Sequence, residues 1–197
     1  MLYQKILSFI AIAITFIAFI PYIYATLFGD NRPHVFSWII WGLTTFIVFL
    51  AQLEAKGGVG AWPIGVSACI TLFIALLAYL KRADVSITRR DWYFFLSALS
   101  SLPLWYFTSD PVWAVLILTL VDILGFGPTI RKVYNDPYSE SLLFFSLFAS
   151  RNLIVIMALE HHSVTTIFFP ATVGLACLVL ISITIVRRKQ LKYHDAF

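Results

Sequence analysis

Long apolar runs separated by brief polar segments fill the chain from one end to the other. Runs of about 20 apolar residues are long enough to cross the hydrocarbon core of a bilayer as α-helices. The residue-by-residue alternation of apolar and polar side chains that marks barrel strands is not seen in these runs. The pattern therefore predicts seven membrane-spanning helices, approximately at residues 6–28, 35–53, 59–80, 92–108, 112–133, 142–159 and 164–186.

The composition supports an integral membrane protein. Of the 197 residues, 60% are hydrophobic and 12% are charged, whereas about 25% of the residues of a typical soluble domain are charged. The loops between the runs leave no room for a soluble ATP-binding domain, so we expect any transport to be driven by gradients. The first run is longer than the apolar part of a signal peptide and shows no cleavage site, so we expect it to be retained.

Basic residues gather on one side of the predicted membrane. By the positive-inside rule this side is cytoplasmic, which places the N-terminus outside and the C-terminus in the cytoplasm. The brief loops and compact size favour a prokaryotic inner (plasma) membrane. The net charge of +4 follows from this bias and requires no nucleic-acid partner. The residues on the cytoplasmic side are Arg32, Lys81, Arg82, Arg89, Arg90, Arg131, Lys132, Arg187, Arg188, Lys189 and Lys192.

The chain also contains a weak internal repeat with an offset of 107 residues. At this offset Pro21 aligns with Pro128, Pro63 aligns with Pro170, and the basic pairs after the third and seventh runs align. Two three-helix units lie parallel only if one further helix reverses the chain between them. We therefore predict an all-α membrane protein with seven transmembrane helices in a 3+1+3 arrangement. Residues 1–82 form the first bundle, 83–110 a linker helix, and 111–197 the second bundle with a basic cytoplasmic tail.

This arrangement resembles the SWEET and PQ-loop (MtN3-like) transporter family over nearly the whole chain. The local evidence is Pro128-Thr129 followed by "KVYNDPYSESLLFF", because the family has Pro-Gln or Pro-Thr in the first helix of each unit and then a short basic and polar loop. The segment "FPATVG" is similar to the family's Pro-Asn-x-x-Gly, with Ala171 in place of the Asn that contacts sugar. Its counterpart in the first unit is "WPIGVS", with Ile64 at that position. The resemblance implies transport by alternating access.

A more distant similarity is to the KDEL receptor, which shares this architecture. In that family an acidic residue precedes the Pro-Gln by the distance between Asp122 and Pro128. An Arg follows a Phe-Phe run in the next helix, much as Arg151 follows Phe144 and Phe145 here.

The four aligned prolines are candidate hinge or gate residues. Proline inside a helix removes a backbone hydrogen bond and clashes with the preceding turn, although proline is also common in membrane helices without a special role. Because the offset between the prolines is constant, we favour kinks at which helix halves tilt. These residues are Pro21, Pro63, Pro128 and Pro170, with Pro21 and Pro128 nearer the cytoplasmic gate.

Ionisable residues interrupt two of the apolar runs. Asp122 lies midway along the fifth run and Arg151 midway along the sixth. An ionised side chain at the bilayer centre costs about 3 kcal/mol or more, so we expect these two residues to pair. Their counterparts in the first unit are Thr15 and Thr44. Three roles stay open: a structural ion pair, a substrate-binding pair in which Arg151 takes a carboxylate or another acceptor, and proton coupling through Asp122.

Further candidate substrate-binding residues lie beside the prolines or at the depth of the charges. Small side chains next to a kink leave room for a ligand, and aromatic rings provide flat walls, although a tryptophan can also serve only in packing or at the membrane interface. With Asp122 and Arg151, the predicted substrate site comprises Trp41, Thr45, Ser67, Asn152 and Thr172.

The sequence thus predicts a membrane transporter that moves a small polar solute (a sugar, an amino acid or a small organic acid) by alternating access. The alternative is a non-transporting membrane receptor or scaffold of the same fold. We do not expect an enzyme, because no histidine lies inside a predicted span.

No cofactor or metal is expected either, since the adjacent His161 and His162 lack the spacing of metal ligands. The expected partners are a small-molecule solute and the lipid bilayer. Protons and a second copy of the chain stay open as further partners.

Overall fold

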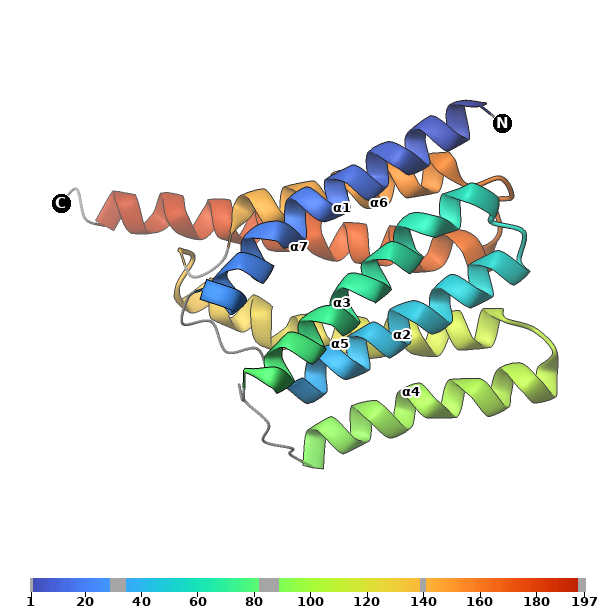
Figure 1. Cartoon of the computed structure of the whole chain (residues 1–197). Coiled ribbons are helices and arrows are strands. Elements are labelled where there is room, and N and C mark those ends of the chain that lie inside the picture. Colours follow the sequence, from blue (N-terminus) through green and yellow to red (C-terminus); the bar gives the residue numbers. More distant parts are fainter. Residues whose placement is uncertain (1, 29–34, 82–88, 139–140, 195–197) are drawn as a thin grey trace.

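Helices make up almost all of the described chain in a computed structural model, which describes residues 2–28, 35–81, 89–138 and 141–194 (Figure 1). A helix covers each predicted run, with ends that differ from the prediction by a few residues, except that α7 continues well past residue 186. The elements are α1 (Leu2–Phe28), α2 (Val35–Glu54), the short 3₁₀ helix η1 (Gly58–Ala61), α3 (Trp62–Leu80), α4 (Arg89–Thr108), α5 (Val112–Asn135), α6 (Leu142–Ala158) and α7 (Val164–His194).

Several of these helices are compatible with an integral membrane protein. Within the described residues, four helical segments are long and apolar enough to cross a bilayer: Leu2–Phe28, Val35–Glu54, Gly58–Leu80 and Val164–Leu191. Val112–Gly127 and Leu142–Ala158 are shorter apolar helices, and α4 begins with three charged residues and contains Pro103. Seven crossings therefore stay a prediction.

Two of the helices show how the sequence sets their starts. The Ser141 hydroxyl accepts a hydrogen bond from the backbone N–H of Phe144 and caps α6. Pro63 lies in the first turn of α3, directly after η1. Because the backbone N–H of that turn has no intrahelical partner, proline costs no hydrogen bond there. The expectation that Pro63 interrupts a helix is therefore wrong, and its role as a hinge stays a prediction.

The other aligned prolines lie within helices. Pro21 lies inside α1 and Pro170 inside α7. The backbone of α5 is helical through Pro128, whose side chain lies outside the described part of the structure. Their action as hinges or gates stays a prediction.

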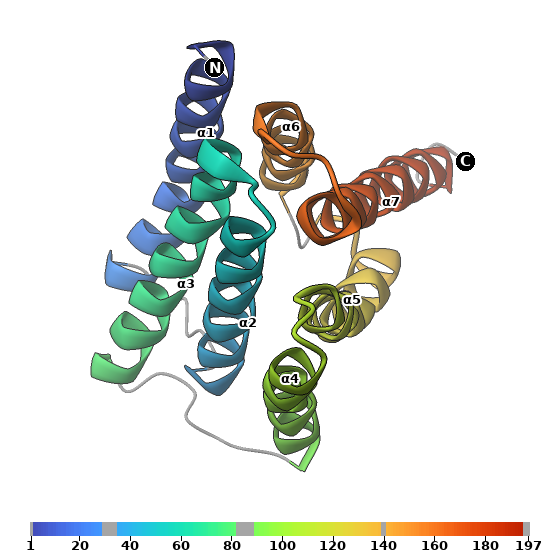
Figure 2. The ribbon, with the colours of Figure 1, turned by 90° about the vertical axis from the view of Figure 1, so that its right-hand side faces the viewer.

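We call α1, α2 and α3 the first group of helices and α5, α6 and α7 the second group. In the first group α3 contacts both α1 and α2, and in the second α7 contacts both α5 and α6. The groups meet where α1 packs against α6 and α2 packs against α5, while α4 contacts α5 and α2 (Figure 2). Many of the buried positions in this core are alanines, which let helix backbones approach closely.

Consecutive helices run in opposite directions, so α1, α3, α5 and α7 all finish at one end of the bundle (Figure 1). We call this the basic end, because Lys81 and Arg89 lie at helix termini there, and Arg187, Arg188 and Lys189 lie in the last third of α7. Of the other residues predicted on this side, Arg32 and Arg82 lie outside the described residues, as do the side chains of Arg90, Arg131, Lys132 and Lys192.

Candidate functional site

A cavity of about 740 Å³ lies between the two groups of helices. This volume is in the range of pockets that hold small molecules, about 300–1,000 Å³. All the long helices except α4 contribute lining residues. The lining comes mainly from the last half of α1 and α5 and the first half of α2 and α6. The cavity therefore lies in the half of the bundle next to the basic end.

Arg151 enters the cavity wall from α6 and is only 2% exposed. Its Nε donates to Thr15 Oγ1 at 3.2 Å, Nη1 donates to Asn152 Oδ1 at 3.2 Å, and Nη2 donates to the backbone oxygen of Pro63 at 2.9 Å. The guanidinium carbon lies 5.4 Å from the ring centroid of Phe148. These contacts hold the cation in one place, and every hydrogen-bond partner is neutral.

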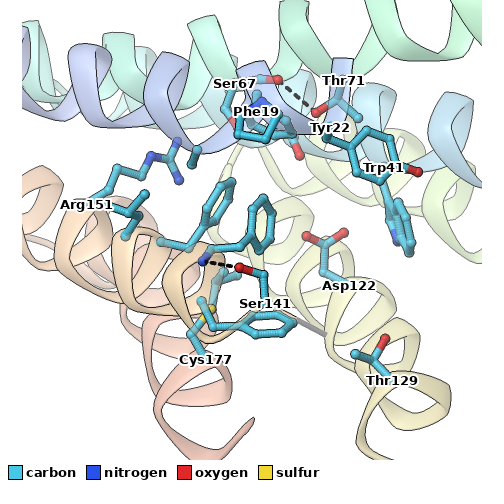
Figure 3. Close-up of a pocket in the computed structure, with 18 of the residues that line it drawn as sticks. Phe19, Tyr22, Trp41, Ser67, Thr71, Asp122, Thr129, Ser141, Arg151 and Cys177 are labelled. Carbon is cyan, nitrogen blue, oxygen red and sulfur yellow. Dashed lines mark hydrogen bonds between the residues drawn. The ribbon is translucent and has the colours of Figure 1, made fainter. Parts of the chain in front are cut away.

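Asp122 enters the wall from α5. Its Oδ1 accepts a hydrogen bond from Thr44 Oγ1 at 3.1 Å. The same hydroxyl lies 3.0 Å from the backbone oxygen of Trp41, so one proton is shared between two acceptors. Figure 3 shows the carboxyl group of Asp122 and the guanidinium of Arg151 on different sides of the cavity.

The predicted ion pair between Asp122 and Arg151 is wrong. No salt bridge joins these two described residues, and each bonds a threonine instead. The reason is the packing order of the helices: α7 lies between α5 and α6, whereas α1 packs on α6 and α2 packs on α5. Arg151 therefore bonds Thr15, which is the repeat counterpart of Asp122. Asp122 bonds Thr44, which is the repeat counterpart of Arg151.

The structure brings four further predicted residues to the same cavity as the two charges. Trp41, Thr45, Ser67 and Pro21 all line it. They lie on three different helices, between positions 21 and 67, so only the packing of α1, α2 and α3 brings them together.

The remaining predicted residues lie elsewhere. Asn152 is fully buried and does not line the cavity; its Nδ2 donates to the backbone oxygen of Phe148 at 2.9 Å, and its Oδ1 accepts from Arg151. Asn152 thus orients Arg151. Thr172 is partly buried in α7 and is not a lining residue, and Pro170 is buried without lining the cavity. Pro63 contributes through its backbone oxygen, the acceptor for Arg151.

Aromatic side chains outside the predicted set form much of the wall. The rings of Phe144 and Phe148 stack with centroids 4.6 Å apart, and Phe19 meets Phe148 edge-on at 5.3 Å. The ring of Tyr22 lies 4.8 Å from that of Trp38. A signal for the first pair is present in the sequence, because residues 141, 144, 148 and 151 are spaced three or four apart and share one face of α6.

The opposite end of the bundle is packed shut, and we call it the closed end. It consists of residues 52–61, around the α2–α3 turn, and residues 158–166, around the α6–α7 turn. The backbone N–H of Glu160 donates to the oxygen of Gly57 at 3.0 Å, and Gln52 Nε2 donates to the oxygen of Thr166 at 2.7 Å. A methyl group on Gly60 would collide with the backbone of Ala158 and Leu159. The two turns are repeat counterparts, so equivalent segments of both groups meet here.

Among the described residues, no group of three or more His, Cys, Asp or Glu side chains could hold a metal ion. Comparison of the chain with protein-family models, curated proteins and solved structures finds no match. The case for a function therefore depends on the cavity and its side chains.

Proposed function

We propose that this protein is an integral membrane transporter that moves a small polar solute by alternating access. In this proposal the solute occupies the cavity between two parallel three-helix units joined by α4, a SWEET-like 3+1+3 arrangement. The solute classes considered are sugars, amino acids and small organic acids.

The packing of the helices supports the two-unit arrangement. A twofold axis along the membrane normal would exchange α1 with α5, α2 with α6 and α3 with α7. The contact of α1 with α6 then becomes the contact of α5 with α2, and both contacts are present. The hydrogen bond of Thr15 with Arg151 becomes that of Asp122 with Thr44, and both are also present. Parallel repeats of this kind are a known plan for transporters.

The observation that carries the proposal is one cavity with two charged side chains in its wall, set against one closed end of the bundle. Alternating access requires a solute site near mid-depth that is sealed from one side at a time. With the basic end in the cytoplasm, this conformation would face inward, and the closed end would be the extracellular gate. We place the protein in a prokaryotic inner membrane with the N-terminus outside; proton coupling and self-association stay open.

The direct experiment is uptake into proteoliposomes across a panel of sugars, amino acids and small organic acids, with and without a pH gradient. Wild type is compared with Asp122→Asn and Arg151→Ala. Ser100→Ala is the matched control, because Ser100 is exposed on α4 and lines no part of the cavity. We expect uptake of at least one solute by wild type and control, and its loss in both cavity variants.

A non-transporting receptor of the same fold is the second candidate, and the hydrogen bonds across the closed end are what favour it. A receptor needs access from only one side and binds a peptide or protein there. Folded wild-type protein that moves no solute of the panel in either direction would exclude the transporter and favour the receptor.

A further inference from the structure

Arg151 is a buried cation without a negative partner in the described part of the chain. Its three hydrogen-bond partners are a hydroxyl, an amide oxygen and a backbone oxygen, all of them neutral. A guanidinium has five N–H donors, so one on each terminal nitrogen is still unused. An uncompensated buried charge is strongly unfavourable. A carboxylate in the cavity would supply the missing charge and could accept two hydrogen bonds from the planar group.

Asp122 offers the opposite chemistry on another wall of the same cavity. Its Oδ1 accepts from Thr44, whereas Oδ2 has no hydrogen-bond partner among the described residues. Figure 3 shows the ring of Trp41 beside this carboxyl group. An ammonium group placed there would donate to Oδ2, and nearby aromatic rings attract cations through their faces.

Aromatic side chains make up much of the wall that the two charged groups share. Phe19, Phe144 and Phe148 contact one another there. Asp122 and Arg151 form no ion pair and lie on different sides of the cavity (Figure 3), so a solute that reaches both needs an acidic group and a basic group spaced apart. Such a solute would have charged ends and an uncharged middle.

We propose that the cavity selects a zwitterion with separated charges, such as an ω-amino acid or a dipeptide, whose carboxylate binds Arg151 and whose ammonium group binds Asp122. The proposal rests on the proposed function, because it names the substrate class of the same cavity. A neutral sugar would leave both charged groups without an opposite charge, a simple anion would leave Asp122 without one, and a simple cation would leave Arg151 without one.

The test is calorimetric titration of the purified full-length wild-type protein with matched ligands. The trio 6-aminohexanoate, hexanoate and hexylamine keeps the chain similar while removing the ammonium group or the carboxylate. Glycine and 4-aminobutyrate vary the separation of the charges, alanyl-alanine represents dipeptides, and glucose is the neutral probe. We expect 6-aminohexanoate or alanyl-alanine to bind about tenfold or more tightly than glycine, glucose or either singly charged analogue, because each lost charged contact is worth a tenfold factor or more.

Two variants assign the ends of the ligand. In Asp122→Asn, the affinities for 6-aminohexanoate and hexanoate should differ by no more than about threefold, because the ammonium group loses its charged partner. In Arg151→Gln, the affinities for 6-aminohexanoate and hexylamine should become similar in the same way, because the carboxylate loses its charged partner. If Arg151→Gln does not fold, the ligand series on wild type decides by itself.

Three results would overturn the zwitterion: equal affinity for 6-aminohexanoate and hexanoate, tightest binding of glucose, or no binding of any zwitterion in the series. Proteoliposome flux separates this inference from the proposed transport. Zwitterion binding without flux would end the transport proposal and leave the ligand class standing. Flux of a neutral sugar alone would support the transport proposal and overturn the zwitterion as the ligand class.

Discussion

The two groups of helices present different side chains at equivalent positions around one cavity. The first group has Thr15 and Thr44 where the second has Asp122 and Arg151. Thr15 donates its own proton to the backbone oxygen of Ala11 and accepts from Arg151, whereas Thr44 donates to Asp122. A hydroxyl can both donate and accept, so one residue type complements a cation and an acid alike.

The difference teaches how a repeat produces a cavity with an asymmetric wall. Each charged group is held by a neutral side chain of the other half, so neither charge neutralises the other. The charges stay available to a ligand, while the threonines fix their positions. A repeat with the same charge at both equivalent positions would place like charges around one cavity, which is unfavourable.

A second contrast lies at the closed end. Gly60 of the first group sits against the backbone of Ala158 and Leu159, and a side chain there would push the two turns apart. Its repeat counterpart is Ile167, which is only partly buried. The first group therefore supplies the glycine that lets the two turns approach closely, and the second group supplies the backbone that this glycine contacts.

The largest effect is expected for Arg151→Thr, which gives both halves the same residue at this position. The change removes the charged contact to a carboxylate, worth about 2–5 kcal/mol, or a loss of affinity of about 30-fold or more. Calorimetry with 6-aminohexanoate measures it, and thermal unfolding checks that the variant is folded. Unchanged affinity in a folded variant would show that Arg151 does not face the ligand.

A smaller effect is expected for Gly60→Ala at the closed end. Overpacking typically costs about 1–3 kcal/mol, so the closed state should lose about fivefold or more of its population to states in which the turns part. A cysteine at Thr166, with Cys69 and Cys177 replaced by alanine, reports this change through its labelling by a membrane-impermeant thiol reagent. Gly127→Ala is the matched control, because nothing lies within 4 Å of its added methyl group. Equal labelling in both variants would mean that the turns do not form the gate.

Thr15→Val and Thr44→Val should each cost a few-fold in affinity, because each change loosens a charged side chain without removing its contact with the ligand. Their effects should differ in kind. Thr15→Val loosens Arg151 and weakens hexanoate binding, whereas Thr44→Val loosens Asp122 and weakens hexylamine binding. Calorimetry with the two analogues separates them, and equal losses on both ligands would contradict the crossed pairing of threonines and charges.

The smallest effects distinguish lining from non-lining residues. Thr172→Val should leave affinity for 6-aminohexanoate unchanged, because Thr172 does not line the cavity. Thr45→Val removes a hydroxyl that does line it and should change affinity by up to about fivefold. A larger effect of Thr172 than of Thr45 in the same titration would mean that the solute site extends beyond this cavity.

The neighbours of the charged residues could not be read from the chain. Asp122 and Arg151 lie on consecutive helices, and this nearness in sequence led to the prediction of an ion pair. The intervening α7, more than ten residues further along the chain than Arg151, separates α5 from α6. The threonine partners were identified as repeat counterparts, but nothing local indicated that they would contact the charges across the two halves.

The sequence by itself determined where the helices lie, that two charged side chains interrupt apolar runs, and that a repeat relates Thr15 to Asp122 and Thr44 to Arg151. These features depend on local composition and on spacing along the chain, which sequence records directly. The tertiary structure alone decided which threonine holds which charge, that Asn152 orients Arg151 without lining the cavity, and that one end of the bundle is closed. These depend on the order in which helices pack, and that order is set by contacts between residues far apart in the chain.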